Sequence, residues 1–357
     1  MPRLSIIIPA LGDWESLETT LVSVLQNRPP RSEVVVVLNQ TYDDPYDLEG
    51  EVRFVEVPVK ASVGRRRAGL VELVNAGLAA AHSEMLHVLS CGATVADGWT
   101  EAPLRHFGNP RVAAVAPLVL DVQNPNQILT AGCTWSRGGG ARSFGRGLRA
   151  DTTISAGPNW IGPELVAGFY RRATLASVAG LDGTLPPELA AVDLNLQLLA
   201  AGGHTVLETA CQIALESSAL RPCRSWTQGW QGERLFWRYA GRRGLMRDLS
   251  AHAWLVATET LRYFGRPSGL ARALGRVLGA CDRRGARRST IFHTDATHAP
   301  NHTPVSANAP RVHTASDIER RVDAPHAPHV PRELRASERG VGAGRKSVNL
   351  SSVEKTP

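Results

Sequence analysis

The sequence predicts an α/β fold with a mostly parallel sheet, and three observations support this. Short β-branched runs alternate with segments of helical periodicity through residues 1–120. The run VVVVL at 34–38 is apolar throughout, which is typical of a strand buried on both faces of a parallel sheet. The segments between such runs are long enough to hold the crossover helices that parallel pairing requires. Because ligands bind beyond the carboxyl ends of such strands, we expect a site in the loops after Pro9, Leu38 and Leu89.

Each element follows from a local pattern. The run LSIIIPA at 4–10 is rich in β-branched residues and predicts the first strand. Asp13 is placed to cap a helix in which Trp14, Leu17 and Leu21 recur at helical spacing. In chain order, we expect strands at 4–10, 33–38, 52–59, 85–89 and 112–120, and helices that begin at 14 and span 64–81 and 99–107.

Composition divides the chain into three parts. Residues 1–220 carry 16 basic and 22 acidic side chains, residues 221–285 carry 13 and 4, and residues 286–357 carry 11 and 7. The last part holds seven of the 23 prolines and one aromatic residue, so it cannot bury enough apolar surface to offset its ordering entropy. We expect a folded α/β domain at 1–220, a basic amphipathic helical extension at 221–285 and a disordered tail at 286–357.

Several classes of protein are excluded. No apolar run approaches the roughly 18 residues that cross a bilayer, and the N-terminus does not have the pattern of a secretory signal. Five cysteines without a CxxC pair argue against a disulfide framework and a zinc site. The net charge of +7 would suit nucleic acid, but that argument rests on charge alone, and nucleic acid is not an expected partner.

The extension contains helices suited to a membrane surface. Apolar residues recur on one face of its last helix, and the preceding helix carries aromatic residues that suit a headgroup boundary. The apolar face consists of Leu270, Leu274, Val277, Leu278 and Cys281, the aromatic residues are Trp254, Tyr263 and Phe264, and the cations are Arg272, Arg276, Arg283 and Arg284. We predict a cytoplasmic protein that lies peripherally on the anionic inner face of the membrane. Alternatively, both helices pack their apolar faces on the folded domain and leave the arginines in water.

Five segments follow one another in a recognisable order. They are SIIIPALGDWESLETTLVSVLQN at 5–27, EVVVVLNQTYDD at 33–44, VNAGLAAAHSEMLHVL at 74–89, ILTAGCTWSRGG at 128–139 and VAGFYRRATLASVAGLDGTL at 166–185. In that order they resemble segments of the family-2 glycosyltransferases: the opening strand and helix, the nucleotide-contacting loop, the approach to the metal-binding Asp-x-Asp, the middle of the rhamnosyltransferase-like branch, and the acceptor side.

The resemblance implies a Rossmann-like, nucleotide-sugar-binding type-A fold. It also implies transfer of a sugar, with inversion at the anomeric carbon, from a nucleotide-sugar to a glycan or lipid-linked acceptor, as in the synthesis of cell-envelope polysaccharide. Such chemistry needs positive charge to offset the leaving nucleoside diphosphate and a carboxylate to deprotonate the acceptor hydroxyl.

The metal-binding motif of the family is replaced in this chain. Where the family has Asp-x-Asp, directly after Leu89, the sequence reads Ser90, Cys91, Gly92. A hydroxyl and a thiol are poor ligands for Mg²⁺ or Mn²⁺, which prefer carboxylate oxygen. We therefore expect no cofactor and no divalent metal.

The catalytic-base motif is replaced too. By register with the family, Ala190 and Ala191 stand where the family has Glu and the base Asp, whereas Asp193 is retained. Asp193 in relatives supports the helix, so it is the weaker candidate for a reacting group. Glu188 is the nearest substitute carboxylate; the alternative is that it is an exposed loop residue.

The resemblance also points to residues around the donor and the acceptor. On the donor side they are Pro9, Ala10, Asn39, Thr41, Asp43, Asn75, Arg65, Ser90 and Gly92, and on the acceptor side they are Arg171, Arg172 and Trp230. Arg65, with Arg66 and Arg67, stands at the expected start of a helix, where arginines can grip a diphosphate in place of a metal. The alternative is a solvated helix turn.

Two hypotheses therefore remain. In the first, the chain is a divergent sugar transferase that uses arginines instead of a metal. In the second, it is a non-catalytic nucleotide- or glycan-binding scaffold derived from the same fold. The replaced motifs favour the second, the resemblance favours the first, and the transferase is the better description of the chain.

Overall fold

The structure is a computed structural model that describes residues 3–58, 67–217, 225–241, 244–264 and 266–282. The expected tail at 286–357 lies outside the described residues, and so do Arg65 and Arg66.

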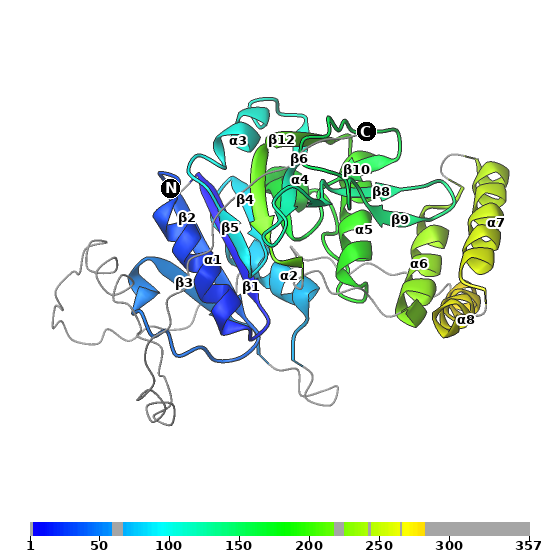
Figure 1. Ribbon diagram of the computed structural model, residues 1–357, viewed down its shortest axis with the longest axis horizontal. Coiled ribbons are helices and arrows are strands. Elements are labelled where there is room, and N and C mark those ends of the chain that lie inside the picture. The colour runs from blue at the N-terminus through cyan, green and yellow to red at the C-terminus, as the bar shows by residue number, and fades with distance from the viewer. Residues whose placement is uncertain (1–2, 59–66, 218–224, 242–243, 265, 283–357) are drawn as a thin grey trace, which may run out of the picture. The chain divides into compact units, whose positions relative to one another are not determined.

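A nine-stranded sheet forms the centre of the molecule (Figure 1). Its order is β3-β2-β1-β4-β11-β6-β12-β5, with β7 paired to β6. The strands are β1 (Leu4–Ala10), β2 (Ser32–Leu38), β3 (Val52–Glu56), β4 (Met85–Leu89), β5 (Ala93–Val95), β6 (Val112–Asp121), β7 (Ile128–Thr130), β11 (Ala167–Arg171) and β12 (His204–Leu215). The predicted α/β class with a mostly parallel sheet is confirmed. The antiparallel strand β11 separates the parallel group β3-β2-β1-β4 from the parallel pair β6-β12.

A second, three-stranded sheet of order β10-β8-β9 lies beside the carboxyl-end loops. Its strands are β8 (Cys133–Trp135), β9 (Ala141–Ser143) and β10 (Trp160–Gly162). Helix α5 (Pro187–Ala200) packs against this sheet, and ten of its residues in succession are buried. A helix buried all round, rather than on one stripe, is a core helix. The short helices are η1 (Leu48–Gly50), α3 (Glu101–His106) and α4 (Arg172–Ala176).

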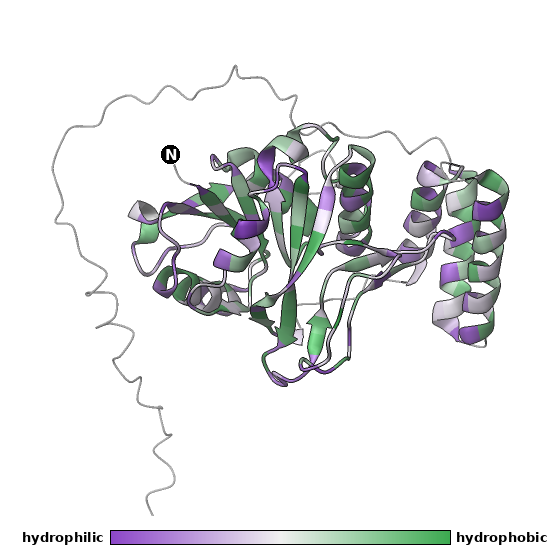
Figure 2. Cartoon of the chain, turned by 90° about the horizontal axis from the view of Figure 1, so that it is seen from above, coloured by the Kyte–Doolittle hydropathy of each residue, from purple (hydrophilic) through white to green (hydrophobic). Residues whose placement is uncertain are grey.

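The core lies between the strands and the helices that cover them. All residues of β1, β4 and β6 are buried, and the strands are largely hydrophobic (Figure 2). Helix α1 (Trp14–Gln26) begins at the predicted cap, because the Asp13 carboxylate accepts a hydrogen bond from the Ser16 N–H at 3.3 Å. Helix α2 (Leu70–Ala80) packs closely across β1 and β2, because a Cβ at Gly77 would lie 2.3 Å from Cγ2 of Ile7.

Helix α2 (Leu70–Ala80) begins later than the expected 64–81. The Gly69 N–H donates to the Glu72 carboxylate at 2.8 Å, which fixes the first turn at this point. Residues 67–69 precede the helix as irregular backbone, so Arg67 does not lie on it. The expected arginine-rich helix start is therefore wrong for Arg67.

Three helices follow the sheet: α6 (Ser225–Tyr239), α7 (Leu245–Arg262) and α8 (Pro267–Cys281). Helices α6 and α8 touch backbone to backbone. A Cβ at Gly229 would lie 2.2 Å from the Arg272 carbonyl oxygen, and one at Gly275 would lie 2.4 Å from the Trp226 carbonyl oxygen. Among the described helices, none combines the length and the apolar character that crossing a membrane demands.

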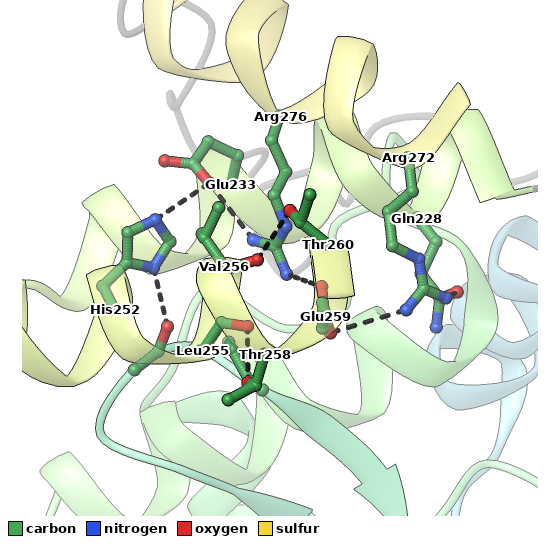
Figure 3. A network of polar contacts seen from close by, with 12 residues as sticks. Gln228, Glu233, His252, Leu255, Val256, Thr258, Glu259, Thr260, Arg272 and Arg276 are labelled. Carbon is green, nitrogen blue, oxygen red and sulfur yellow. Dashed lines mark hydrogen bonds and ion pairs between the residues drawn. The ribbon is translucent and has the colours of Figure 1, made fainter. Parts of the chain in front are cut away.

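The arginines of α8 point inward, contrary to expectation. Arg276 contacts Glu233 of α6 at 3.2 Å and Glu259 of α7 at 2.8 Å, and Arg272 contacts Glu259 at 3.5 Å. His252 Nε2 lies 3.2 Å from the same Glu233 carboxylate, which completes a network joining three helices (Figure 3). The expectation that Arg272 and Arg276 supply surface cations is therefore wrong: the half-buried Glu259 holds both of them, and the buried Glu233 also holds Arg276.

Candidate functional site

A cavity of about 780 Å³ lies at the carboxyl ends of β1 and β4. This volume is in the range of small-molecule sites. Pro9 of β1 and Ser90 and Cys91 after β4 line one side of it. The other walls come from the segments around β9 and β10, from the first turn of α5, and from the inner faces of α6, α7 and α8. The loops expected after Pro9 and Leu89 thus contribute, while residues 38–43 do not line this cavity.

Glu164, just after β10, is a buried carboxyl group in the cavity wall. Burial raises the pKa of this carboxyl to about 7, and the negative charge of Glu188 adds to the rise. The hydroxyl groups of Ser143 and Thr130, together with the charge of Arg146, act in the opposite direction. A carboxyl group with a pKa near neutrality exchanges protons readily at physiological pH, which suits a general acid or base.

Glu188 reaches the same cavity from the first turn of α5. The turn starts at Pro187, whose fixed backbone suits the first helical position. Oxygen Oε2 of Glu188 is buried and has no hydrogen-bond partner among the described residues. A buried, unpartnered carboxylate oxygen is costly, so a ligand group that donates a hydrogen bond here stabilises it.

Arginines reach the cavity from three elements. Arg142 lies on β9 and Arg146 follows it, and both are exposed at the cavity wall. Arg262 comes from the last turn of α7. Within the described part of the chain, no ion pair holds Arg142 or Arg262, whereas Arg272 is bound to Glu259. Guanidinium groups in such a position bind phosphate oxygens bidentately.

Comparison with known proteins shows what part of the chain is similar to. Residues 5–151 match the family model described as Glycosyl transferase family 2. The match covers less than half of the chain, and residues 5–151 are the family-2 region of the molecule. The family-2 region contributes Pro9, Ser90, Cys91 and the β9 arginines to the cavity, whereas Glu164 and Glu188 lie beyond it in the sequence.

Curated relatives and solved structures extend the comparison. The chain is 29% identical over 145 residues to polypeptide N-acetylgalactosaminyltransferase 13 of Rattus norvegicus, Mus musculus and Homo sapiens, covering 39% of this chain. It spans about a quarter (26%) of the length of these relatives. Among solved structures, GalNAc-T7 with UDP, GalNAc and Mn²⁺ aligns at 17% identity and a TM-score of 0.46, over 60% of this chain and 44% of that one. The mannosyltransferase PcManGT from Pyrobaculum calidifontis, in complex with GDP-Man and Mn²⁺, aligns at 14% identity and a TM-score of 0.47. The alignment covers 77% of this chain and 87% of that one.

The residues after β4 do not fit a divalent metal. Ser90 donates its backbone N–H to the Val166 carbonyl at 2.9 Å, and the Cys91 thiol donates to the Pro9 carbonyl at 3.3 Å. Burial and the nearby Asp13 raise the pKa of Cys91 to about 12, so this sulfur stays a thiol rather than a metal-binding thiolate. No group of three or more His, Cys, Asp or Glu suited to a metal occurs in the described residues. The three residues after β4 therefore offer none of the carboxylate oxygens that Mg²⁺ and Mn²⁺ prefer.

The predicted donor-side residues divide into two groups. Pro9 and Ser90 line the cavity, Ala10 is buried beside Pro9, and Gly92 adopts a positive φ of 81° in the turn after β4. The remaining residues lie elsewhere. Asn39 donates to the Ala68 carbonyl at 3.2 Å, Asn75 donates to the Leu181 carbonyl at 3.0 Å, and Thr41 and Asp43 are exposed outside the cavity lining.

The predicted acceptor-side residues make structural contacts. Arg171 donates to the carbonyls of Phe107 at 2.7 Å and Val112 at 3.0 Å, and Arg172 donates to that of Ser83 at 2.7 Å. Because β11 is antiparallel to β4, Arg171 pairs with Met85 at the opposite edge of the sheet from Ser90. The backbone of Trp230, on α6, lies against Gly275 and Gly279 of α8, and the Arg234 guanidinium lies 5.6 Å from the centre of the Trp230 ring. None of the three lines the cavity.

Asp193 does not reach the cavity. Its carboxylate lies 3.0 Å from Arg238 and accepts hydrogen bonds from Tyr239 at 2.7 Å and Gln197 at 2.8 Å. It is 1% exposed, so these bonds satisfy it inside the core. Of the two predicted catalytic carboxylates, the structure brings Glu188 alone into the cavity, next to Glu164, which the sequence analysis did not identify.

Proposed function

We propose that this chain transfers a sugar, with inversion, from a nucleotide-sugar donor to a glycan or lipid-linked acceptor in the synthesis of cell-envelope polysaccharide. One observation carries the proposal: a cavity at the carboxyl ends of β1 and β4, in the family-2 region, is lined by a buried carboxyl group whose pKa is near 7. A nucleotide-sugar and an acceptor hydroxyl are the reactants that need both features.

Glu164 serves as the proton acceptor in this proposal. The acceptor hydroxyl gives its proton to the Glu164 carboxylate while its oxygen forms a bond to the anomeric carbon. The bond from that carbon to the phosphate oxygen breaks, and the nucleoside diphosphate leaves with the electron pair. Glu188 lies beside Glu164 and raises its pKa, so it keeps the base strong enough to take the proton.

The leaving diphosphate is stabilised by arginines rather than by a metal. Arg142, Arg146 and Arg262 line the cavity and supply fixed positive charge. Arg65 and Arg66 lie outside the described residues, and their participation remains a prediction. The residues after β4 contribute backbone contacts and a small hydroxyl rather than metal ligands.

The second candidate is a non-catalytic nucleotide- or glycan-binding scaffold. The observation that favours it is the fully buried pair Ala190 and Ala191 in α5, at the two positions where the family resemblance implies carboxylates. A scaffold of this kind binds a nucleotide-sugar in the cavity and releases it unchanged.

A titration with UDP-, GDP- and dTDP-sugars, with and without Mn²⁺, tests the proposal. We expect one donor class to bind, with the same affinity in the presence and absence of Mn²⁺. When an acceptor extract is added, we expect nucleoside diphosphate to be released from that donor. A tenfold or larger gain in affinity on adding Mn²⁺ would contradict metal-independent binding. Binding without release of nucleoside diphosphate would favour the scaffold.

A further inference from the structure

The outer faces of α7 and α8 carry an unusual number of exposed apolar side chains. The large ones are between 48% and 84% exposed, and they are Leu245, Met246, Trp254, Leu261, Phe264, Leu270, Leu274, Val277 and Leu278. On α8 they recur at helical spacing along one face, opposite the buried Gly275 and Gly279. Single exposed apolar residues are ordinary, but a stripe on each of two consecutive helices marks an interaction surface.

The acidic side chains of these two helices are held in ion pairs, whereas some of their arginines remain exposed. Asp248 lies 3.7 Å from Arg137, Asp282 lies 3.7 Å from Arg234, and Glu259 is bound to Arg272 and Arg276. All acidic residues described in α7 and α8 and at their ends are thus neutralised by ion pairs. Among the described residues of these helices and their ends, the exposed charges that remain are Arg247 and Arg266, besides Arg262, which lines the cavity. The surface is therefore apolar with a positive rim.

We propose that this surface, the outer face of α7 and α8, docks on a bilayer that contains anionic lipid. Apolar side chains with Trp and Phe among them enter the headgroup boundary, and the arginines at the rim attract anionic headgroups. The buried network of Figure 3 holds the two helices in place, so the face is formed before it meets lipid.

Two other occupants fit the surface less well. A second copy of the chain would bring its own Arg247, Arg262 and Arg266 against these arginines, and like charges at an interface oppose association. The chain's own residues 286–357 are also net basic, with 11 basic and 7 acidic side chains, and contain one aromatic residue to place against the apolar stripe. An anionic membrane satisfies both the apolar stripe and the positive rim.

The same helix that faces the proposed membrane also lines the cavity. Glu259, Arg262 and Tyr263 of α7 and the turn after it lie in the cavity wall, whereas Leu261 and Phe264 are exposed. The cavity and the docking surface are thus separated by the thickness of one helix. This placement suits an acceptor whose lipid stays in the bilayer while its head group enters the cavity. The assignment of such an acceptor rests on the proposed sugar transfer, whereas the docking surface is argued independently of it.

Vesicle binding of the full-length protein tests the proposal. The test variant changes Leu261, Leu270 and Leu274 to Gln, and the matched control changes Val22, Val122 and Leu148, which are exposed on other elements, to Gln. A third variant changes Arg247 and Arg266 to Gln and leaves the cavity residue Arg262 intact. Each protein is sedimented with vesicles of phosphatidylcholine alone or with added phosphatidylglycerol.

We expect the unaltered protein and the control to bind vesicles with phosphatidylglycerol, and the leucine variant to lose about 100-fold in partitioning. The arginine variant should bind more weakly, with a smaller salt dependence. The proposal would be overturned if all four proteins sedimented equally with the vesicles, or if the unaltered protein did not sediment with anionic vesicles at low salt. Self-association without lipid that disappears in the leucine variant would overturn it too, because the occupant is then a second copy. Nucleotide-sugar titration of the same variants should be unchanged, which separates failure of docking from failure of the proposed function.

Discussion

Glu164 is the residue whose removal distinguishes catalysis from binding. Because its carboxyl must lose a proton before it acts as a base, the transfer rate should rise as pH rises through about 7, the pKa that burial gives it. Glu164→Gln should lower kcat about 10²-fold or more and abolish this rise, while donor affinity changes little. A pH series of steady-state rates measures both effects. A rate in Glu164→Gln close to that of the unaltered protein would remove it as the base.

Glu188 has a separable role at the same scale. Its negative charge is one cause of the raised pKa of Glu164. Glu188→Gln should therefore move the midpoint of the pH–rate profile to lower pH while the protein stays active. If Glu188→Gln loses as much activity as Glu164→Gln, and its residual pH–rate profile keeps the same midpoint, then Glu188 is the base instead.

The cavity arginines predict a third effect on single residues. Arg142→Gln should weaken binding of a nucleoside diphosphate about tenfold, because one charge-assisted phosphate contact is lost. Binding of the corresponding nucleoside, which has no phosphate, should not change. Arg149→Gln is the matched control, since Arg149 lies in the loop after β9, binds Asp151 at 2.8 Å and does not line the cavity. Isothermal titration separates the two outcomes, and equal losses in both variants would contradict the assignment.

Sequence alone identified some of these residues and missed others for physical reasons. The loops after Pro9 and Leu89 were expected at the site because parallel strands place their carboxyl ends at one edge, and the family resemblance pointed to Pro9 and Ser90. The structure has both residues in the cavity wall. Glu164 sits in the tripeptide PEL, which has no local feature that separates it from a solvated loop. Its burial arises when β9 and β10 fold beside α5, a contact between segments far apart in the chain.

At the scale of elements, long strands were predictable and short ones were not. The predicted strands at 4–10, 33–38, 85–89 and 112–120 correspond to β1, β2, β4 and β6, because each has enough apolar residues for its pattern to appear. Strands β7 to β10 have three residues each, too few to display a period of two. Helix α5 is buried almost throughout, so it shows no polar face from which helical periodicity could be recognised.

Strand β4 contains a buried histidine whose titration should affect stability. His87 is 0% exposed and stacks on Phe169 with 3.7 Å between ring centroids. Burial lowers its pKa to about 3, although a hydrogen bond to the Gly168 carbonyl opposes the shift. In the unfolded chain the pKa is near 6.5, so between pH 6.5 and 3 the unfolded state binds more protons and stability falls as pH falls.

This linkage predicts the outcome of a specific substitution. Between pH 7 and pH 5, His87 should cost the folded state about 2 kcal/mol, and His87→Leu should remove that part of the pH dependence even if it lowers stability at pH 7. Urea unfolding at the two pH values measures the difference. His204→Gln, at an exposed histidine, is the control. The same pH dependence in His87→Leu as in the unaltered protein would show that His87 is not responsible.

At the scale of the whole molecule, charge composition was a poor guide to charge placement. Residues 221–285 carry 13 basic side chains, which suggested a basic surface. In the structure, Arg234, Arg238, Arg272 and Arg276 are instead bound to carboxylates between elements. A helical wheel drawn from the sequence shows which residues share a face, but not whether that face meets the core, a partner helix or solvent.

Arg238 joins α6 to the segment that contains the start of α5. Its guanidinium lies 2.7 Å from Asp182 and 3.0 Å from Asp193, and all three side chains are less than 10% exposed. Burial opposes the charge of Asp182, but hydrogen bonds from Thr184 and Arg238 outweigh it and lower the pKa of this carboxyl. One cation therefore compensates two buried carboxylates that lie on either side of the start of α5.

Removing this cation should destabilise the whole molecule rather than one helix. Arg238→Met leaves two buried carboxylates without their partner, and the expected loss is about 3–5 kcal/mol in the free energy of unfolding. Arg238→Lys, which keeps the charge but not the two-pronged geometry, should lose less. Chemical denaturation is followed by tryptophan fluorescence and by circular dichroism; the eight tryptophans include Trp226, Trp230 and Trp237 of α6, and the other five lie on other segments. We expect both signals to show one common transition at lower denaturant concentration in Arg238→Met. Two separate transitions would show that α6 detaches on its own and that Arg238 does not couple the two parts.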